Sequence, residues 1–177
     1  EVDDITSLVV NPAGLAYGRG MEGFFEFNTG NAARSQVTGL LKLPLIHGGY
    51  LHEDAGSHDY DAYLFGTAVQ IAPFSVGWTF SLNRVDWGRG RRAPAHHLGL
   101  QFRPNRVVSA GLAVRNVNNP PLADGHLDRG YAVAISTRPL AARPEGLTLT
   151  AQGDWPRPAA RGEFTLGTEF RVVDGLR

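Results

Sequence analysis

The sequence has no cysteine, one methionine and a single lysine, Lys42, among its 17 basic residues. Without cysteine, the chain forms no disulfide and offers no thiolate to a metal ion. It also lacks an apolar run of the ~18 residues that a membrane-crossing helix needs. The formal net charge is zero. This balance argues against nucleic acid as a partner, because phosphate binding requires an excess of basic residues.

Residues suited to catalysis are also scarce. The sequence contains no Gly-x-Ser-x-Gly motif, and Lys42 is the only lysine that could act as the base of a Ser–Lys peptidase. His96 and His97 are adjacent, so a strand would point them to opposite faces and keep them from sharing a metal ion. We therefore expect no enzyme activity, no catalytic residue, no metal site and no cofactor.

A two-residue alternation of apolar and small polar side chains runs through most of the chain. In residues 74–83 the apolar side chains occupy every second position, and Ser, Gly, Thr and Asn fill the others. Since successive side chains of a strand point to opposite faces, each such segment predicts a strand with two different faces. The alternation is less regular in the first four segments. We predict ten antiparallel strands, at residues 21–29, 37–43, 45–52, 60–71, 74–83, 96–103, 107–117, 131–138, 147–154 and 163–172.

The connections between these strands alternate between short and long, so in an up-and-down meander all short turns fall at one end. The short connections are at Pro44, at Ala72-Pro73, at 104–106 and, somewhat longer, at 139–146. The long polar ones are at 29–36, 53–59, 86–95, 118–130 and 155–162. Outer-membrane barrels have this asymmetry, with short periplasmic turns and longer external loops.

These patterns predict an all-β fold, an antiparallel up-and-down transmembrane β-barrel in the outer membrane of a Gram-negative bacterium, surrounded by outer-membrane lipid. The polar face carries Gly, Ala, Ser and Thr rather than the Lys and Glu of a water-facing sheet. Aromatic residues lie toward strand ends, as in the girdles of membrane barrels. The alternative is a soluble β-sheet protein that binds a ligand, because alternation alone also fits a sandwich or a lipocalin-like barrel.

Residues 1–20 precede the first strand and contain the run Asn11-Pro12-Ala13-Gly14-Leu15-Ala16. Asn-Pro favours a turn and Gly14 disfavours a helix, and we find no amphipathic helix in the chain. The run resembles the N-terminal signature of the fatty-acid-transporter-like outer-membrane barrels, which the type IX secretion shuttle barrels share. The resemblance implies a plug or hatch at residues 1–20, with barrel strands at 21–177. The residues of the plug site are then Asn11, Pro12, Ala13, Gly14 and Leu15.

The resemblance also implies a function, the uptake or translocation of hydrophobic small molecules. A narrower resemblance, in residues 108–118, 131–140 and 147–155, is to barrel regions fused ahead of signal-peptide-peptidase-like proteases. It implies instead a non-transport barrel that anchors or shuttles a protein partner or a fused protease domain. The fatty-acid transporters have more strands than the ten predicted here, and the last residues look like a turn. We therefore expect the barrel to continue beyond this chain.

Charged residues fall in two kinds of place. Charges on the polar faces would line the barrel lumen, where they pair with each other, bind a plug or tune a channel. These predicted lumen-facing charges are Glu26, Arg115, Glu163, Glu169 and Arg171. A second group, Arg89, Arg91 and Arg92, lies in the long loop at 86–95 and is a weak candidate for binding lipid phosphates. A solvated loop is the simpler explanation of that group.

Overall fold

The computed structural model describes residues 4–17, 20–29, 35–54, 59–85, 92–122, 125–139, 147–155 and 161–170. Among these residues, ten strands form one antiparallel sheet in which each strand pairs with the strands before and after it in the order β1-β2-β3-β4-β5-β6-β7-β10-β11-β12. The strands are β1 (Glu22–Thr29), β2 (Ser35–Lys42), β3 (His47–Asp54), β4 (Asp59–Ile71), β5 (Phe74–Val85), β6 (Arg92–Phe102), β7 (Val108–Arg115), β10 (Gly130–Thr137), β11 (Leu147–Trp155) and β12 (Glu163–Phe170).

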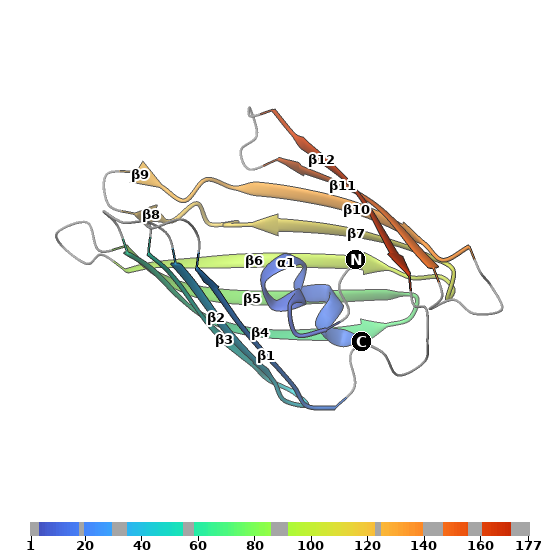
Figure 1. Ribbon diagram of the computed structural model, residues 1–177, viewed down its shortest axis with the longest axis horizontal. Helices are drawn as coiled ribbons and strands as arrows, with labels where there is room; N and C mark the ends of the chain where they lie inside the picture. The colour runs from blue at the N-terminus through green and yellow to red at the C-terminus, as the bar shows by residue number, and fades with distance from the viewer. Residues whose placement is uncertain are drawn as a thin grey trace.

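All ten predicted strands are present, and the all-β antiparallel meander is confirmed. The sheet is open, however, because β1 and β12 are its two edges and no described strand pairs with their free sides. Figure 1 shows the sheet curving from β1 to β12 without the two edges meeting. The closed barrel of the sequence prediction is therefore not present among the described residues.

The connections differ in part from the predicted rhythm. β3, β4 and β5 extend further than predicted, which shortens the connections that join β3 to β4 and β5 to β6. The connection from β7 to β10 contains a small hairpin of β8 (Pro121–Leu122) and β9 (Gly125–His126) that the sequence did not predict. Asn116 and Asn119 enter this connection with positive φ angles, which asparagine tolerates better than most residues. We call the end of the sheet that carries this connection the long-loop end.

Two short helices, which the sequence patterns did not reveal, precede the sheet. α1 is Ser7–Val10, and η1, a 3-10 helix, is Pro12–Ala16. The Asn11 side chain accepts a hydrogen bond from the Ala13 amide, and Pro12 occupies the first turn of η1. Proline fits that position because a first-turn amide has no partner within the helix. Neither described helix has the length and apolar character needed to cross a membrane.

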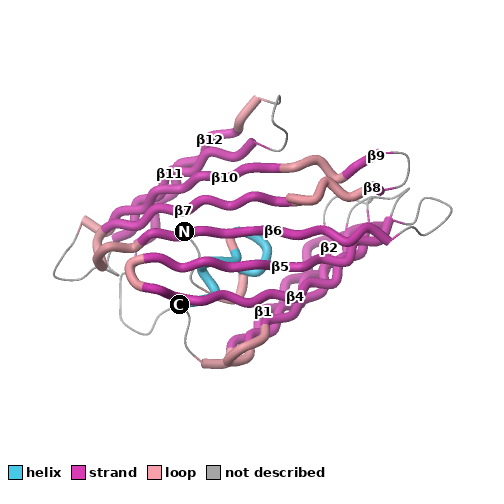
Figure 2. The backbone as a smooth tube through the Cα atoms, turned by 180° about the vertical axis from the view of Figure 1, so that it is seen from behind, coloured by secondary structure: helices cyan, strands magenta, loops and turns pink. Residues whose placement is uncertain are grey.

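Both helices lie on the same side of the sheet. In Figure 1 they are in front of β4, β5 and β6, and Figure 2, drawn from behind, places them on the far side of these strands. We call the side that carries the helices the inner face and the opposite side the outer face. The N-terminal segment thus lies against the inner face of the central strands.

The two faces differ sharply in chemistry. On β5, Ser75, Thr79 and Ser81 point to the inner face and are at most 1% exposed, whereas Val76 and Trp78 point outward and are 48% and 40% exposed. The same difference between faces extends to the neighbouring strands, because each inner-face residue is paired with an inner-face residue of the next strand. Small polar residues are therefore buried and large apolar residues exposed, the reverse of a water-soluble sheet.

One charged residue is buried on the inner face. Lys42 is 2% exposed, and its Nζ lies 3.8 Å from Oε1 of Glu22, which is opposite it in register. Neither Nζ nor the Glu22 Oε2 atom has a hydrogen-bond partner. A buried ion pair without further hydrogen bonds recovers little of its desolvation cost.

Replacing the two partners should therefore have unequal effects. We expect Glu22→Gln to destabilise the protein by about 1–3 kcal/mol, because it leaves the buried ammonium without a counter-ion. We expect Lys42→Met to cost less than Glu22→Gln, because the remaining Glu22 side chain is 31% exposed whereas the Lys42 side chain is 2% exposed. Urea unfolding of detergent-refolded protein measures both, and a larger loss for Lys42→Met would contradict this account.

Candidate functional site

A row of glycines on the inner face forms the seat of the N-terminal segment. A Cβ atom at Gly77 would overlap the carbonyl of Pro12, and one at Gly99 would overlap the Asn11 side chain. A Cβ atom at Gly66 would overlap the side chain of Leu8. Gly77 and Gly99 are also opposite each other in register. The backbone of residues 11–13 therefore approaches the sheet more closely than any side chain on β5 or β6 would permit.

Side-chain hydroxyls beside these glycines hold the same segment by hydrogen bonds. Ser75 donates to the carbonyl oxygen of Ala13 at 3.0 Å, and Thr79 donates to that of Leu8 at 3.0 Å. The Asn11 amide donates to the carbonyl of Leu100 on β6 at 3.4 Å. Both hydroxyls are fully buried. These bonds attach the N-terminal segment directly to β5 and β6.

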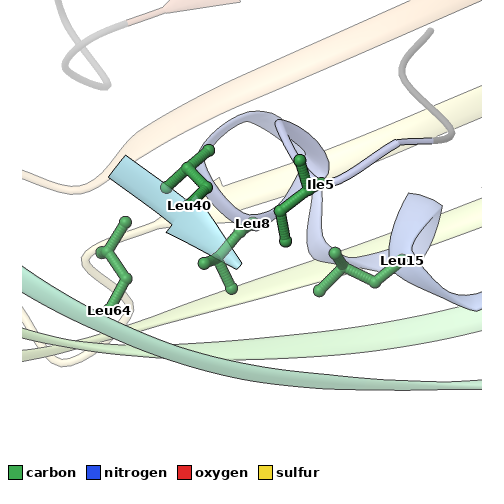
Figure 3. Close-up of a cluster of buried hydrophobic side chains, with 5 residues drawn as sticks. All are labelled: Ile5, Leu8, Leu15, Leu40 and Leu64. Carbon is green, nitrogen blue, oxygen red and sulfur yellow. The ribbon is translucent and has the colours of Figure 1, made fainter. Parts of the chain in front are cut away.

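Apolar contacts complete the seat on the side of β1 to β4. Figure 3 shows Ile5, Leu8 and Leu15 of the N-terminal segment gathered with Leu40 of β2 and Leu64 of β4. All five side chains are buried, and Phe24, Leu51 and Ala68 pack around them. Among the described residues, the buried leucines of the inner face lie in this region. This explains the irregular alternation of the first four strands, whose residues are apolar on both faces where the segment packs.

The predicted plug-site residues all lie in the N-terminal segment that this seat holds. Pro12, Ala13, Gly14 and Leu15 are buried in η1, and Asn11 links η1 to β6. The glycines and hydroxyls that receive them were not predicted. A sequence signal for them existed, because Gly66, Gly77, Gly99 and Gly111 all occupy inner-face positions of neighbouring strands.

A cavity of about 190 Å³ lies between α1 and the long-loop end of the inner face. One wall is apolar, formed by Leu8, Val9, Leu51, Ala62, Leu64 and Leu127. The other wall is polar, formed by Tyr60, Ser81, Asn83, His97, Arg115 and Asn116. Leu127 and Asn116 come from the connection between β7 and β10, so this connection closes the cavity at the long-loop end. A second, smaller cavity of about 40 Å³ lies between Asn11 and β7, β10 and β11.

The polar wall is a hydrogen-bonded network centred on Ser81. The Ser81 Oγ lies 2.8 Å from Nε2 of His97 and accepts from the Asn83 amide at 2.9 Å. The Asn83 amide oxygen in turn accepts from the Tyr60 hydroxyl at 2.7 Å. The backbone amide of Asn116 donates to Nδ1 of His97 at 3.4 Å. Patterns within single strands do not reveal this group, because its members meet only through strand register.

The direction of these bonds fixes the role of Ser81. Because Nδ1 of His97 accepts a hydrogen bond, the neutral ring carries its proton on Nε2 and donates it to Ser81 Oγ. Ser81 Oγ thus accepts two hydrogen bonds. In this arrangement His97 does not withdraw the hydroxyl proton, as the base of an activated serine nucleophile would.

The predicted lumen-facing charges occupy the inner face where they are described. Arg115 on β7 forms an ion pair with Asp154 on β11, passing over Gly130 of the intervening β10. Register places Glu163 and Glu169 of β12 on the inner face, aligned with Asp154 and Thr148. Glu26 of β1 is on the same face, opposite Thr38 of β2. Arg171 lies outside the described residues.

The predicted anion-binding loop is only partly described. Arg89 and Arg91 lie outside the described residues, and Arg92 is an exposed residue at the start of β6. Arg92 is opposite Arg84 of β5 in register. Within the described ranges, no group of three or more His, Asp or Glu residues is placed to hold a metal ion.

No family model, no curated protein and no solved structure matches this chain.

The glycine seat gives a direct test of how the N-terminal segment is held. We expect Gly77→Val to destabilise the protein by at least ~2 kcal/mol and to expose residues 1–20 to proteolysis, because the added carbons overlap the Pro12 backbone. Gly39→Val is the control, since a Cβ atom at Gly39 meets no heavy atom within 4 Å. Urea midpoints and the rate of N-terminal cleavage measure both effects. Equal results for the two variants would mean that the segment is not seated on Gly77.

Proposed function

We propose that this protein is an outer-membrane β-barrel protein that takes up hydrophobic small molecules past its N-terminal segment. The observation that carries the proposal is the reversed polarity of the sheet. The outer face exposes a continuous set of large apolar side chains, among them Phe25, Phe65, Val76, Ile135 and Leu166, each 48–74% exposed. Soluble proteins rarely expose apolar patches beyond a few hundred Å², so lipid is the environment that suits this face.

The shape of the apolar surface supports the same environment. On β4 the apolar surface ends at Tyr63, next to Asp61, and on β11 it ends at Trp155. The residue pairs that connect Trp155 across the sheet to β4 lead to Thr67 and not to Tyr63. The apolar band therefore shifts by about one residue per strand. With a rise of ~3.3 Å per residue and ~4.8 Å between strands, a level band requires strands tilted by roughly 30–35°. Strands of membrane barrels tilt by about 35–45°.

Aromatic residues lie at the edge of this apolar band that faces the long-loop end of the sheet. Tyr50 and Tyr63 lie side by side on the outer face of β3 and β4, with ring centroids 5.2 Å apart. The Tyr50 hydroxyl donates a hydrogen bond to Asp61, which is the first polar residue beyond the band toward the long-loop end. Tyr131 and Trp155 are opposite each other at the corresponding ends of β10 and β11. Tyrosine and tryptophan favour the membrane–water interface because they combine an apolar ring with a polar atom.

The interior supports the uptake part of the proposal. The 190 Å³ cavity places Leu8 and Val9 of α1 opposite Leu51 and Leu64 of the sheet, so an apolar molecule finds a desolvated wall on two sides. The N-terminal segment forms the floor of this cavity. A molecule bound in this cavity would therefore contact the segment that the resemblance identifies as a plug.

A charge on the outer face separates a membrane environment from water. We expect Val76→Arg to destabilise the membrane-inserted protein by ~2–4 kcal/mol, because the guanidinium would lie in hydrocarbon. In water, the same change at a half-exposed position would cost within ~0.5 kcal/mol. Folding into lipid vesicles, followed by heat-modifiable gel mobility and urea titration, measures the difference.

Asp59→Arg is the matched control for this substitution. Asp59 is exposed at the start of β4 and lies outside the apolar band, toward the long-loop end. We therefore expect its replacement to leave insertion into the membrane unchanged. Equal urea midpoints for the Val76→Arg variant and the unchanged protein would contradict membrane insertion of the outer face.

Uptake itself is tested in intact Gram-negative cells with radiolabelled benzene, a hydrophobic molecule that a cavity of this size can hold. We expect cells that express the protein to take up benzene several-fold faster than cells that express Ala62→Phe, because the larger side chain fills the cavity beside α1. Equal rates, with both proteins folded in the outer membrane, would overturn the uptake proposal and leave membrane insertion standing.

A further inference from the structure

The hydrogen bonds within the polar wall of the 190 Å³ cavity determine which of its groups can bind a ligand. The Asn83 amide oxygen is taken by Tyr60, and Nδ1 of His97 is taken by the Asn116 amide. Ser81 Oγ accepts from both His97 and Asn83, so its own proton points away from both donors. The Ser81 hydroxyl proton is therefore the donor that the Ser81–His97–Asn83 group leaves for a ligand.

The charge of the same wall is balanced. Arg115 lines the cavity, but its guanidinium is already paired with the Asp154 carboxylate. A ligand carboxylate would therefore enter a site with no net positive charge and would lose its own hydration, which is costly. A neutral acceptor such as a carbonyl oxygen loses much less hydration and can accept from Ser81.

The volume limits the size of the ligand. Sites for drug-sized ligands are typically ~300–1,000 Å³, and an apolar cavity of ~150 Å³ accommodates one benzene molecule. At about 190 Å³, this cavity holds one ring with a small substituent and does not enclose an extended chain.

We infer that the cavity beside α1 binds a compact, neutral, ring-sized molecule that carries one hydrogen-bond-accepting oxygen, with its ring against Leu8, Leu51 and Leu64 and its oxygen at Ser81. This inference rests on the proposed uptake function and specifies the class of molecule that reaches the N-terminal segment. The apolar wall provides the affinity, and the Ser81 hydroxyl distinguishes an aromatic ketone from a hydrocarbon of the same size.

The test compares three probes of similar size: acetophenone, toluene and benzoate. Binding to the full chain refolded in detergent is measured by titration calorimetry, and the signal of the folded Ala62→Phe variant in the same micelles is subtracted to remove partition into detergent. We expect acetophenone to bind about 3–10-fold more tightly than toluene, the range that one net hydrogen bond supplies. We expect benzoate to bind more weakly than either.

Two variants identify the groups responsible. Ser81→Ala should abolish the preference for acetophenone over toluene while leaving toluene binding unchanged, and Ser136→Ala, a buried hydroxyl outside the cavity, should keep the preference. Asp154→Asn should increase benzoate binding at least several-fold by freeing Arg115.

A preference for acetophenone that survives in Ser81→Ala would overturn the inference, as would benzoate binding to the unchanged protein as tightly as acetophenone. A folded, membrane-inserted protein that takes up benzene but binds none of the three probes would reject this ligand class and leave the proposed function intact. Failure of membrane insertion would reject the proposed function instead.

Discussion

The limited side-chain volume on the inner face is the constraint on which the rest of the structure depends. Residues 11–13 lie against β5 and β6 only because Gly77 and Gly99 carry no side chain there. Where the inner face consists of glycine, serine and threonine, on β5, it holds the N-terminal segment through hydrogen bonds from Ser75 and Thr79, and apolar packing is confined to the side of β1 to β4. The apolar residues that would form a core in a soluble protein are consequently on the outer face.

Much of the fold could be predicted from the sequence because the strand period is so regular. Alternation identified all ten strands of the main sheet and the face on which residues such as Val76 and Ser81 lie. It failed where another interaction determined the backbone. α1 and η1 form because Asn11 caps η1 and the sheet buries Leu8 and Leu15, effects that hydrophobic periodicity does not include. The β8–β9 hairpin is too short to have a period. Whether the sheet closes depends on the edges β1 and β12, about which alternation gives no information.

The candidate site divides in the same way. The Asn-Pro-Ala-Gly-Leu run pointed to the N-terminal segment, and its residues are buried on the inner face. The Ser81–His97–Asn116 group was missed because Ser81 and His97 are on adjacent strands and Asn116 follows a third, so they meet only after register is fixed. Arg115 was expected to face the lumen, but its partner Asp154 was not identified, since the pair passes over Gly130 on an intervening strand. Contacts across strands depend on register, which single-strand patterns do not specify.

The central claim is that the outer face contacts lipid and the inner face does not. Val133 and Ala134 are neighbours on β10 at nearly the same depth but point to opposite faces. Because the chain has no cysteine, Val133→Cys and Ala134→Cys each give a single site for a fluorescent label. In vesicles that contain a lipid with a nitroxide on its acyl chain, the account predicts strong quenching of the label at position 133 and little at position 134. Equal quenching at both positions, or stronger quenching at 134, would contradict it.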